Sequence, residues 1–276
     1  MYKSADFSGF FMTAIEFLKP VSKSFCSVEH LRKMAVIVNV TENIRRDRMA
    51  TLTIRYYSTA LTECNSMNLV LPSGNGPWPV VWLLAPMGCG YTCWGAHTDM
   101  EALAEQKQKM LVMPDLKLSC GLDMIHGLRY HTMLVSELPF FLSTHFSVDL
   151  NSQIIVGAKE GAYAALYAAA DGKQNYEKVI ALSGGSLPEE KNIDEDLRFC
   201  YAFGDRVSSL KESSYNVEKQ VEKIQKNSKL YVAYGLKDSY SYSASRLAAK
   251  VPPTYVDIST GTLDWTKWYQ ILKKRI

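Results

Sequence analysis

The stretch that decides the fold spans residues 152–170 and reads SQIIVGAKEGAYAALYAAA. Residues 153–156 form a short, mostly apolar run, which predicts a buried strand. Two closely spaced glycines, Gly157 and Gly161, predict a tight turn, and the residues after them predict a helix. Such a turn lifts its central side chain above the edge of a sheet, at the N-terminus of the helix.

The turn itself, Gly157-Ala158-Lys159-Glu160-Gly161, has the glycine spacing of the G-x-S-x-G motif. In that motif a nucleophilic serine stands between a strand and a helix. Glycines flank the serine because side chains there would collide with the neighbouring strand and helix. Here Lys159 takes the place of the serine. We therefore expect the geometry of a catalytic turn without its usual nucleophile.

Strands are expected on both sides of this turn. An antiparallel edge pair and several continuously apolar runs, typical of strands buried on both faces, are predicted. The predicted strands are residues 52–57, 66–71, 79–84, 109–113, 153–156, 178–182, 229–234 and 254–258. Their alternation with helices predicts an α/β fold with a mostly parallel sheet of about eight strands.

The helices between these strands are predicted from apolar spacing and end signals. They cover residues 99–108, 130–146 and 264–274, and Pro139 must kink or divide the second of them. In the last helix Trp265, Trp268 and Leu272 are expected to face the core. Residues 186–228 are polar and contain one amphipathic stretch, residues 215–225. We expect this segment to be an insertion over the edge where the turn lies.

Composition places the chain among globular proteins. Its 276 residues are 47% hydrophobic and 21% charged, which suits one large domain. A net charge of only +3 gives no basic footprint for nucleic acid. The six cysteines have neither metal-ligand nor dense disulfide spacing, so reduced thiols in the cytoplasm are expected, with no cofactor or metal.

Residues 1–48 are predicted to be an N-terminal extension, and residues 49–276 the single folded domain. Residues 7–18 are apolar, but Glu16 interrupts them, no small-residue cleavage site follows, and the run is too short to span a bilayer. Export and membrane insertion are therefore not expected. One hypothesis is that the native chain starts at Met49, where the strand-rich sequence begins.

Seven stretches in the same order along the chain carry a resemblance to a known family. They are PVVWLLAPMGCGYTCW (79–94), MLVMPD (110–115), SELPFFL (136–142), IIVGAKEGAYAAL (154–166), VIALSGG (179–185), YGLKDSY (234–240) and STGTLDWTKW (259–268). Together they resemble the esterase family that includes tributyrin esterases and the S-formylglutathione hydrolase (esterase D) group. The resemblance covers about residues 49–276 and implies the α/β-hydrolase fold.

The resemblance also implies where a catalytic triad would stand. Lys159 falls at the nucleophile position, Asp238 at the acid position and Leu263 at the histidine position, within Gly261-Thr262-Leu263-Asp264-Trp265. A lysine amine is protonated near neutral pH unless it is strongly desolvated, and Glu160 beside it favours the charged form. A leucine cannot carry a proton. The triad is therefore expected to be degenerate.

The oxyanion-binding loop differs from the family as well. Ala85-Pro86 stands where the family usually has His-Gly, and proline has no N–H to donate. The backbone amides of Met87 and Glu160 remain the candidates for the two oxyanion donors.

Three functional hypotheses follow. The first is a pseudo-hydrolase that has lost serine-esterase chemistry and binds a small acyl-ester-like ligand or a partner in the old cleft. The second is an active carboxylic-ester hydrolase with relocated machinery. It would use one nucleophile and one base from a set of five residues: Ser183, Cys89 or Cys93 with His126 or His131. The third is a structural or interaction subunit, such as a homo-oligomer, with a sticky surface of aromatic residues: Tyr201, Tyr234, Tyr240, Tyr242, Trp265 and Trp268.

Overall fold

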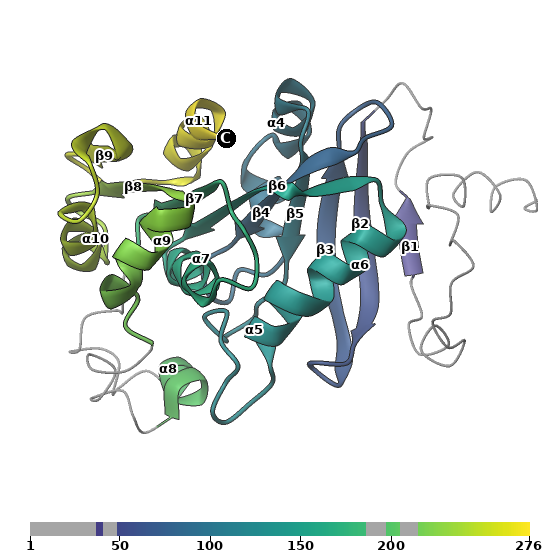
Figure 1. Ribbon diagram of the computed structural model, residues 1–276, viewed down its shortest axis with the longest axis horizontal. Coiled ribbons are helices and arrows are strands. Elements are labelled where there is room, and N and C mark those ends of the chain that lie inside the picture. The colour runs from purple at the N-terminus through teal and green to yellow at the C-terminus, as the bar shows by residue number, and fades with distance from the viewer. Residues whose placement is uncertain (1–36, 41–48, 186–196, 205–214) are drawn as a thin grey trace, which may run out of the picture.

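The computed structural model describes residues 37–40, 49–185, 197–204 and 215–276 (Figure 1). Most of the predicted extension therefore lies outside the described residues, as does much of the polar insertion.

A nine-stranded sheet organises the described residues, in the order β1-β2-β3-β5-β4-β6-β7-β8-β9. Its strands are β1 (Ile37–Val40), β2 (Ala50–Ser58), β3 (Glu63–Leu71), β4 (Trp78–Leu84), β5 (Met110–Pro114), β6 (Val148–Ala158), β7 (Lys178–Leu182), β8 (Lys229–Gly235) and β9 (Val256–Ser259). Pairing is antiparallel from β1 to β5 and parallel from β5 to β9. All eight predicted strands are confirmed. The ninth, β1, was not predicted and lies within the predicted extension.

Helices connect the strands and cover both faces of the sheet (Figure 1). They are α3 (Cys93–His97), α4 (Met100–Lys107), α5 (Tyr130–Thr132), η1 (Met133–Glu137), α6 (Leu138–His145), α7 (Glu160–Asp171), α8 (Leu197–Phe203), η4 (Val217–Gln220), α9 (Val221–Asn227), α10 (Ser241–Ala248), η5 (Pro253–Tyr255) and α11 (Trp265–Arg275). The predicted helix ends are close to the observed ones. Asp99 and Asp264 cap α4 and α11, each accepting a hydrogen bond from a backbone N–H at 2.9 Å.

Pro139 divides the predicted helix over residues 130–146 as expected, and the chain passes it through a wider π-helical turn, η1. Proline cannot donate to the carbonyl four residues before it, which belongs to Val135. Gln174 Nε2 donates to that carbonyl at 2.9 Å. The helix thus continues past the proline without leaving this carbonyl unpaired.

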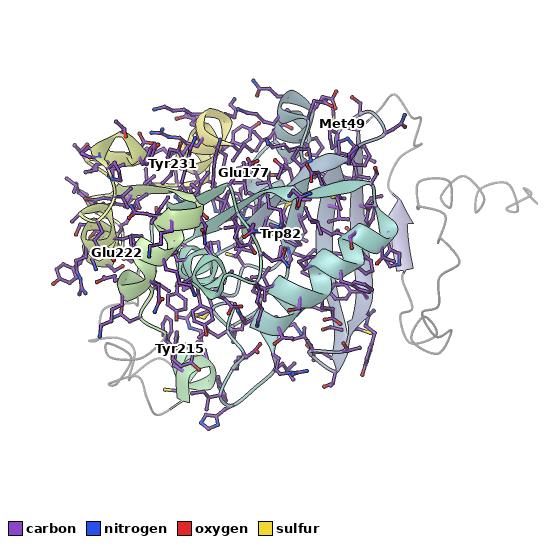
Figure 2. All side chains as sticks on the ribbon, viewed as in Figure 1. Met49, Trp82, Glu177, Tyr215, Glu222 and Tyr231 are labelled. Carbon is purple, nitrogen blue, oxygen red and sulfur yellow. The ribbon has the colours of Figure 1, made fainter. Side chains whose placement is uncertain are left out.

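Two apolar cores lie on opposite faces of the sheet. The larger packs α5 to α10 against one face, and the smaller packs α3, α4 and α11 against the other. Figure 1 shows α4 and α11 on one side of the strands and α7 and α9 on the other. Trp82 of β4, labelled in Figure 2, is 1% exposed, and its Nε1 donates to Gln153 of β6 at 2.8 Å. Trp268 and Leu272 are buried as predicted, and Trp265 is half-buried against the smaller core.

The turn between β6 and α7 needs glycine at both of its ends. A Cβ on Gly157 would lie 1.8 Å from the carbonyl oxygen of Gly161, and a Cβ on Gly161 would lie 2.4 Å from the carbonyl oxygen of Leu84 in β4. Both clashes are with backbone atoms, which cannot rotate away. The predicted reason for these glycines is therefore confirmed.

We expect Gly157→Ala to lower the free energy of unfolding by about 3 kcal/mol or more, because the new methyl group overlaps backbone. Urea unfolding followed by circular dichroism measures this change. Gly95→Ala is the matched control, since a Cβ at Gly95 in α3 meets nothing within 4 Å. Equal stability of the two variants would contradict the close approach.

Candidate functional site

The candidate site lies at the carboxyl ends of the parallel strands, where loops after β4, β5, β6, β7 and β8 meet. This edge is where open α/β sheets place their ligands. The described part of the polar insertion reaches the same edge, because Phe199 and Phe203 of α8 line a cavity there with Lys159 and Tyr240. Helix α8, the part of the insertion that contributes these two side chains, therefore lies at the cleft as predicted, and residues 186–196 and 205–214 lie outside the described residues.

Lys159 stands at the apex of the turn, with φ 52° and ψ −117°. Positive φ is rare for a residue with a Cβ and marks a strained turn. Its N–H donates to Leu182 O of β7 at 2.8 Å, and its carbonyl accepts from Ala162 N at 2.9 Å. The side chain is half-buried, and among the described residues no hydrogen bond or ion pair holds its ammonium group. The structure therefore presents an amine where the motif presents a hydroxyl.

Glu160 turns its carboxylate into the place expected for an oxyanion. Its Oε2 accepts the backbone N–H of Met87 at 3.1 Å, and its Oε1 accepts the hydroxyl of Tyr240 at 2.5 Å. The Met87 amide was predicted to be an oxyanion donor, and here a carboxylate of the chain itself occupies it. Tyr240 was considered only as a surface aromatic residue. Its place two residues after Asp238, in a loop expected at the cleft, was the signal available in the sequence.

The Tyr240 hydroxyl is a donor and stays protonated. Burial, and then the negative charge of Glu160, raise the pKa of Tyr240 far above its ordinary value. The phenol therefore donates to the Glu160 carboxylate at any physiological pH.

Asp238 is bound to backbone amides rather than to a basic side chain. Its Oδ2 accepts the N–H of Gly235 at 2.7 Å, and its Oδ1 accepts the N–H of Leu263 at 2.9 Å. Asp238 and Leu263, which the sequence placed at the acid and histidine positions, therefore lie next to each other in the structure. The Leu263 side chain, however, is 9% exposed and packs in the smaller core with Trp94 and Trp268. The carboxylate therefore fixes the loop that carries Leu263.

Two cavities flank Glu160. The first is open to solvent and has a volume of about 10 Å³, enough for about one water molecule, and its walls include Pro86, Met87, Leu116 and Lys117. The second also has a volume of about 10 Å³, and its walls include three buried aromatic side chains: Tyr163, Phe199 and Phe203. Glu160 and Cys120 line both cavities, so these two residues form the partition between them. The sequence did not predict that Cys120, Phe199 and Phe203 line these cavities, because none of them belongs to a recognisable motif.

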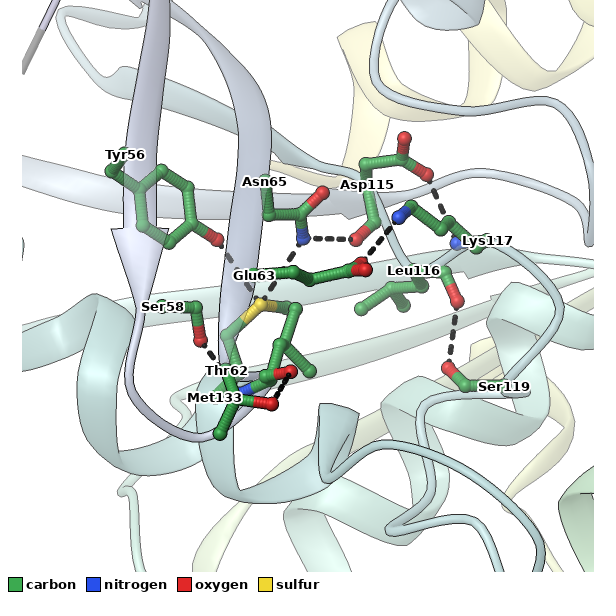
Figure 3. A network of polar contacts seen from close by, with 11 residues as sticks. Tyr56, Ser58, Thr62, Glu63, Asn65, Asp115, Leu116, Lys117, Ser119 and Met133 are labelled. Carbon is green, nitrogen blue, oxygen red and sulfur yellow. Dashed lines mark hydrogen bonds and ion pairs between the residues drawn. The ribbon is translucent and has the colours of Figure 1, made fainter.

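A polar network holds one wall of the first cavity in place (Figure 3). Asn65 of β3 donates to the carbonyl of Asp115 at 2.9 Å, and Asp115 Oδ1 accepts the N–H of Lys117 at 2.9 Å. Lys117 pairs with Glu63 at 2.5 Å, and this hydrogen bond raises the pKa of the lysine. The loop after β5 is therefore tied to the antiparallel half of the sheet.

The residues proposed for relocated catalysis are not brought together. His131 Nε2 lies 3.0 Å from Asp171 at the far end of α7, twelve residues or about 18 Å from the turn. His126 is exposed. Ser183 is 1% exposed, and its Oγ accepts from Trp268 Nε1 at 2.9 Å. None of these side chains has a described contact with another of the set.

The cysteine candidates lie beside the first cavity rather than in it. Cys93 donates its thiol to the carbonyl of Cys89 at 2.7 Å, and Gly90 between them lines the cavity. Burial above all, together with the contacts to Cys89, raises the pKa of Cys93 to about 11. A thiol in that state is a poor nucleophile near neutral pH.

The aromatic surface predicted for an interaction protein is only partly present. Tyr201 and Tyr242 are exposed, at 54% and 56%. Tyr234 is 5% exposed, and Tyr240 bonds to Glu160, so the prediction was wrong for these two residues. Strand β8 is covered by helices, which is why Tyr234 faces inward. The ring centroids of Trp265 and Trp268 lie 5.0 Å apart, and the Trp265 ring also packs against Trp94.

No helix of the described residues has the length and apolarity needed to cross a membrane. Within the same ranges, no three His, Cys, Asp or Glu side chains gather where they could hold a metal ion.

The mostly parallel sheet, the helices on both faces and the strained strand-to-helix turn define the α/β-hydrolase fold. The model of a family described as "Putative esterase" matches residues 126–239. No curated protein sequence matches the chain. The family match and the fold together confirm the predicted resemblance to the α/β-hydrolase esterase family.

Solved structures with a similar fold include three from two bacteria. The fluorophosphonate-binding serine hydrolase FphF of Staphylococcus aureus has a TM-score of 0.71 and 19% identity, over 82% of this chain and 96% of that chain. The S-formylglutathione hydrolase FrmB of the same organism has a TM-score of 0.67 and 19% identity, over 82% and 97%. An S-formylglutathione hydrolase from Agrobacterium tumefaciens has a TM-score of 0.70 and 15% identity, over 86% and 96%.

We expect Asp238→Asn to lower the free energy of unfolding by about 1–3 kcal/mol, because an amide can accept with only one of its two ends and one backbone N–H loses its partner. Chemical unfolding measures the loss. Lys237→Ala is the control, since this neighbouring side chain is exposed and should change stability by less than about 0.5 kcal/mol. A loss no larger than that of the control would show that the two hydrogen bonds do not hold the loop.

Cys93 should react slowly with iodoacetamide near neutral pH and faster as the pH rises toward 11, because its raised pKa keeps the thiol protonated. Mass spectrometry of the alkylated peptides gives the rate at each cysteine. The exposed Cys64 provides the comparison in the same sample. Alkylation of Cys93 near neutral pH as fast as that of Cys64 would overturn the expectation.

Proposed function

We propose that this esterase-family α/β-hydrolase binds a small acyl-ester-like ligand in its cleft and has lost serine-esterase chemistry. The observation that carries the proposal is the side chain at the apex of the turn. A protonated lysine cannot attack an ester, and an amide formed by a neutral lysine would not turn over. Lys159 can hold a ligand by its charge, but it does not replace the serine.

The acid and base positions support the same proposal. Each carboxylate oxygen of Asp238 accepts a hydrogen bond from a backbone N–H group, and the Leu263 side chain is packed in an apolar core. In a working triad the acid orients an imidazole and stabilises its charged form. Here Leu263 takes the place of that imidazole, so the general base is missing as well as the nucleophile.

The oxyanion position gives a third, independent argument. Acyl transfer needs donors aimed at the place where negative charge develops. The Met87 N–H is aimed at Glu160 instead, and a carboxylate there repels a developing oxyanion. Restoring hydrolysis would therefore require moving Glu160 as well as supplying a serine and a histidine.

An active carboxylic-ester hydrolase is the alternative, and the family match over residues 126–239 favours it. One of the similar structures is described as a fluorophosphonate-binding serine hydrolase. Covalent labelling of the wild-type chain by a fluorophosphonate probe, with the modified residue mapped in the cleft, would favour this alternative over the proposal.

Two further expectations remain proposals. A structural or interaction role, including a homo-oligomer, is tested by light scattering on the purified chain and by Tyr201→Ala and Tyr242→Ala. A cytoplasmic location is tested by fractionation of the native cells.

We expect the wild-type chain to hydrolyse p-nitrophenyl acetate no faster than a heat-denatured sample. The double variant Lys159→Ser, Leu263→His should gain little, because Glu160 still covers the Met87 amide. Adding Glu160→Ala should raise the rate by about tenfold or more, since a freed oxyanion donor is worth on the order of a hundredfold. The matched control carries Lys159→Ala in place of Lys159→Ser.

Wild-type hydrolysis well above the denatured sample, abolished by alanine at a cleft residue, would refute the proposed loss of chemistry. A triple variant no faster than its control would mean that the cleft itself has diverged around Pro86.

A further inference from the structure

Two thiols meet where the loop after β4 enters α3. Cys89 lies in the loop, and Cys93 is the first residue of α3, four positions further on. The Cys93 thiol donates to the carbonyl oxygen of Cys89 at 2.7 Å, and the two side chains are also joined by a hydrogen bond. Both residues are partly exposed, so a small solute in water can reach them.

Two other cysteines have different surroundings. Cys64 is exposed on β3, in the antiparallel half of the sheet. Cys120 is buried, and its thiol lies 3.7 Å from the thioether sulfur of Met87, which cannot form a disulfide. Cys64 and Cys120 therefore serve as comparisons for the pair, one of them exposed and the other buried.

The loop has room for the movement that a disulfide requires. A disulfide bond is about 2.05 Å long and holds its two Cα atoms about 4.4–6.8 Å apart. Gly88 and Gly90, on either side of Cys89, have φ of 80° and 71°, and a Cβ at either position would meet nothing closer than 3.8 Å. Glycines in open space let the backbone turn without a clash. The Cys89 thiol can therefore approach Cys93 while the buried Trp94 anchors α3.

We propose that Cys89 and Cys93 are a redox pair, which a peroxide converts to a reversible disulfide. The Cys89 thiolate attacks one oxygen of hydrogen peroxide, the O–O bond breaks, and Cys89 becomes a sulfenic acid as hydroxide leaves. The Cys93 sulfur then attacks the Cys89 sulfur, and the Cys93 proton departs with the sulfenic hydroxyl group as water. In total the two thiols lose two hydrogens, and one peroxide becomes two waters.

The two thiols have different roles in this sequence. Burial, followed by the contacts with Cys89 and the negative charge of Asp115, raises the pKa of Cys93 to about 11. A thiol that stays protonated attacks peroxide slowly, so the first step falls to Cys89 and the second to Cys93. Met87 and Gly90, in the same loop as Cys89, line the first cavity. The disulfide thus ties a wall of that cavity to α3.

The test oxidises the reduced full chain with a small excess of hydrogen peroxide and then alkylates the remaining thiols in urea. Chymotrypsin cuts after aromatic residues such as Trp82 and Trp94, which separates the pair from Cys64 and Cys120. Mass spectrometry should find Cys89 linked to Cys93 with the loss of two hydrogens, and dithiothreitol should restore both thiols.

Single variants test the two roles. Cys93→Ser should leave Cys89 as a sulfenic acid that dimedone traps, because the second thiol is gone. Cys64→Ser is the matched control and should form the disulfide as the wild type does. A wild-type chain in which peroxide oxidises Cys64 while Cys89 and Cys93 stay reduced would overturn the proposal.

A second measurement asks whether the fold brings the thiols together, because cysteines four residues apart also pair in an unfolded chain. Equilibration with reduced and oxidised glutathione gives the effective concentration of the pair. This value should be at least about tenfold higher for the folded chain than for the chain in urea, since the fold holds the two side chains in contact. Equal values in the two conditions would show that the structure does not prepare the pair, and would overturn the proposal.

Discussion

The contact on which the site depends is backbone against backbone, where β6 turns into α7. Without a side chain at Gly157 and Gly161, the helix start packs onto the carbonyl oxygens of its neighbours at a distance that no Cβ permits. This packing forces Lys159 into positive φ and fixes where its side chain begins. The same turn positions Glu160, the next residue, so that its carboxylate reaches Met87 and Tyr240. The chemistry of the cleft is therefore set by a steric constraint.

Two acidic side chains of the cleft, Asp238 and Glu160, accept hydrogen bonds from backbone N–H groups. Asp238 holds the loops of Gly235 and Leu263, and Glu160 holds the loop of Met87 together with the Tyr240 hydroxyl. In a hydrolase of this fold, charge at such positions would orient an imidazole or stabilise an oxyanion. Here the carboxylates at these positions hold neighbouring loops together through hydrogen bonds to backbone N–H groups. These hydrogen bonds keep the loops of the cleft in place.

Much of the fold could be predicted, because strands buried on both faces have long apolar runs and helices have caps and regular spacing. Edge strand β1 was missed because residues 1–48 were interpreted as an extension, although its sequence, IVNV, is rich in β-branched residues. The wider turn at η1 could not be predicted, because it depends on Gln174 reaching the carbonyl that Pro139 leaves unpaired. His131 had the right residue type for a base, but the direction of its helix turns it toward Asp171.

The sequence by itself determined the α/β-hydrolase architecture, the glycine turn and the three positions where Lys159, Asp238 and Leu263 stand, since local patterns and motif spacing encode them. Only the tertiary structure decided what those positions touch. Met87 and Tyr240 meet Glu160 because three strands end at one edge of the sheet, and no spacing along the chain records that meeting. The partition between two cavities is likewise a product of loops that converge in space.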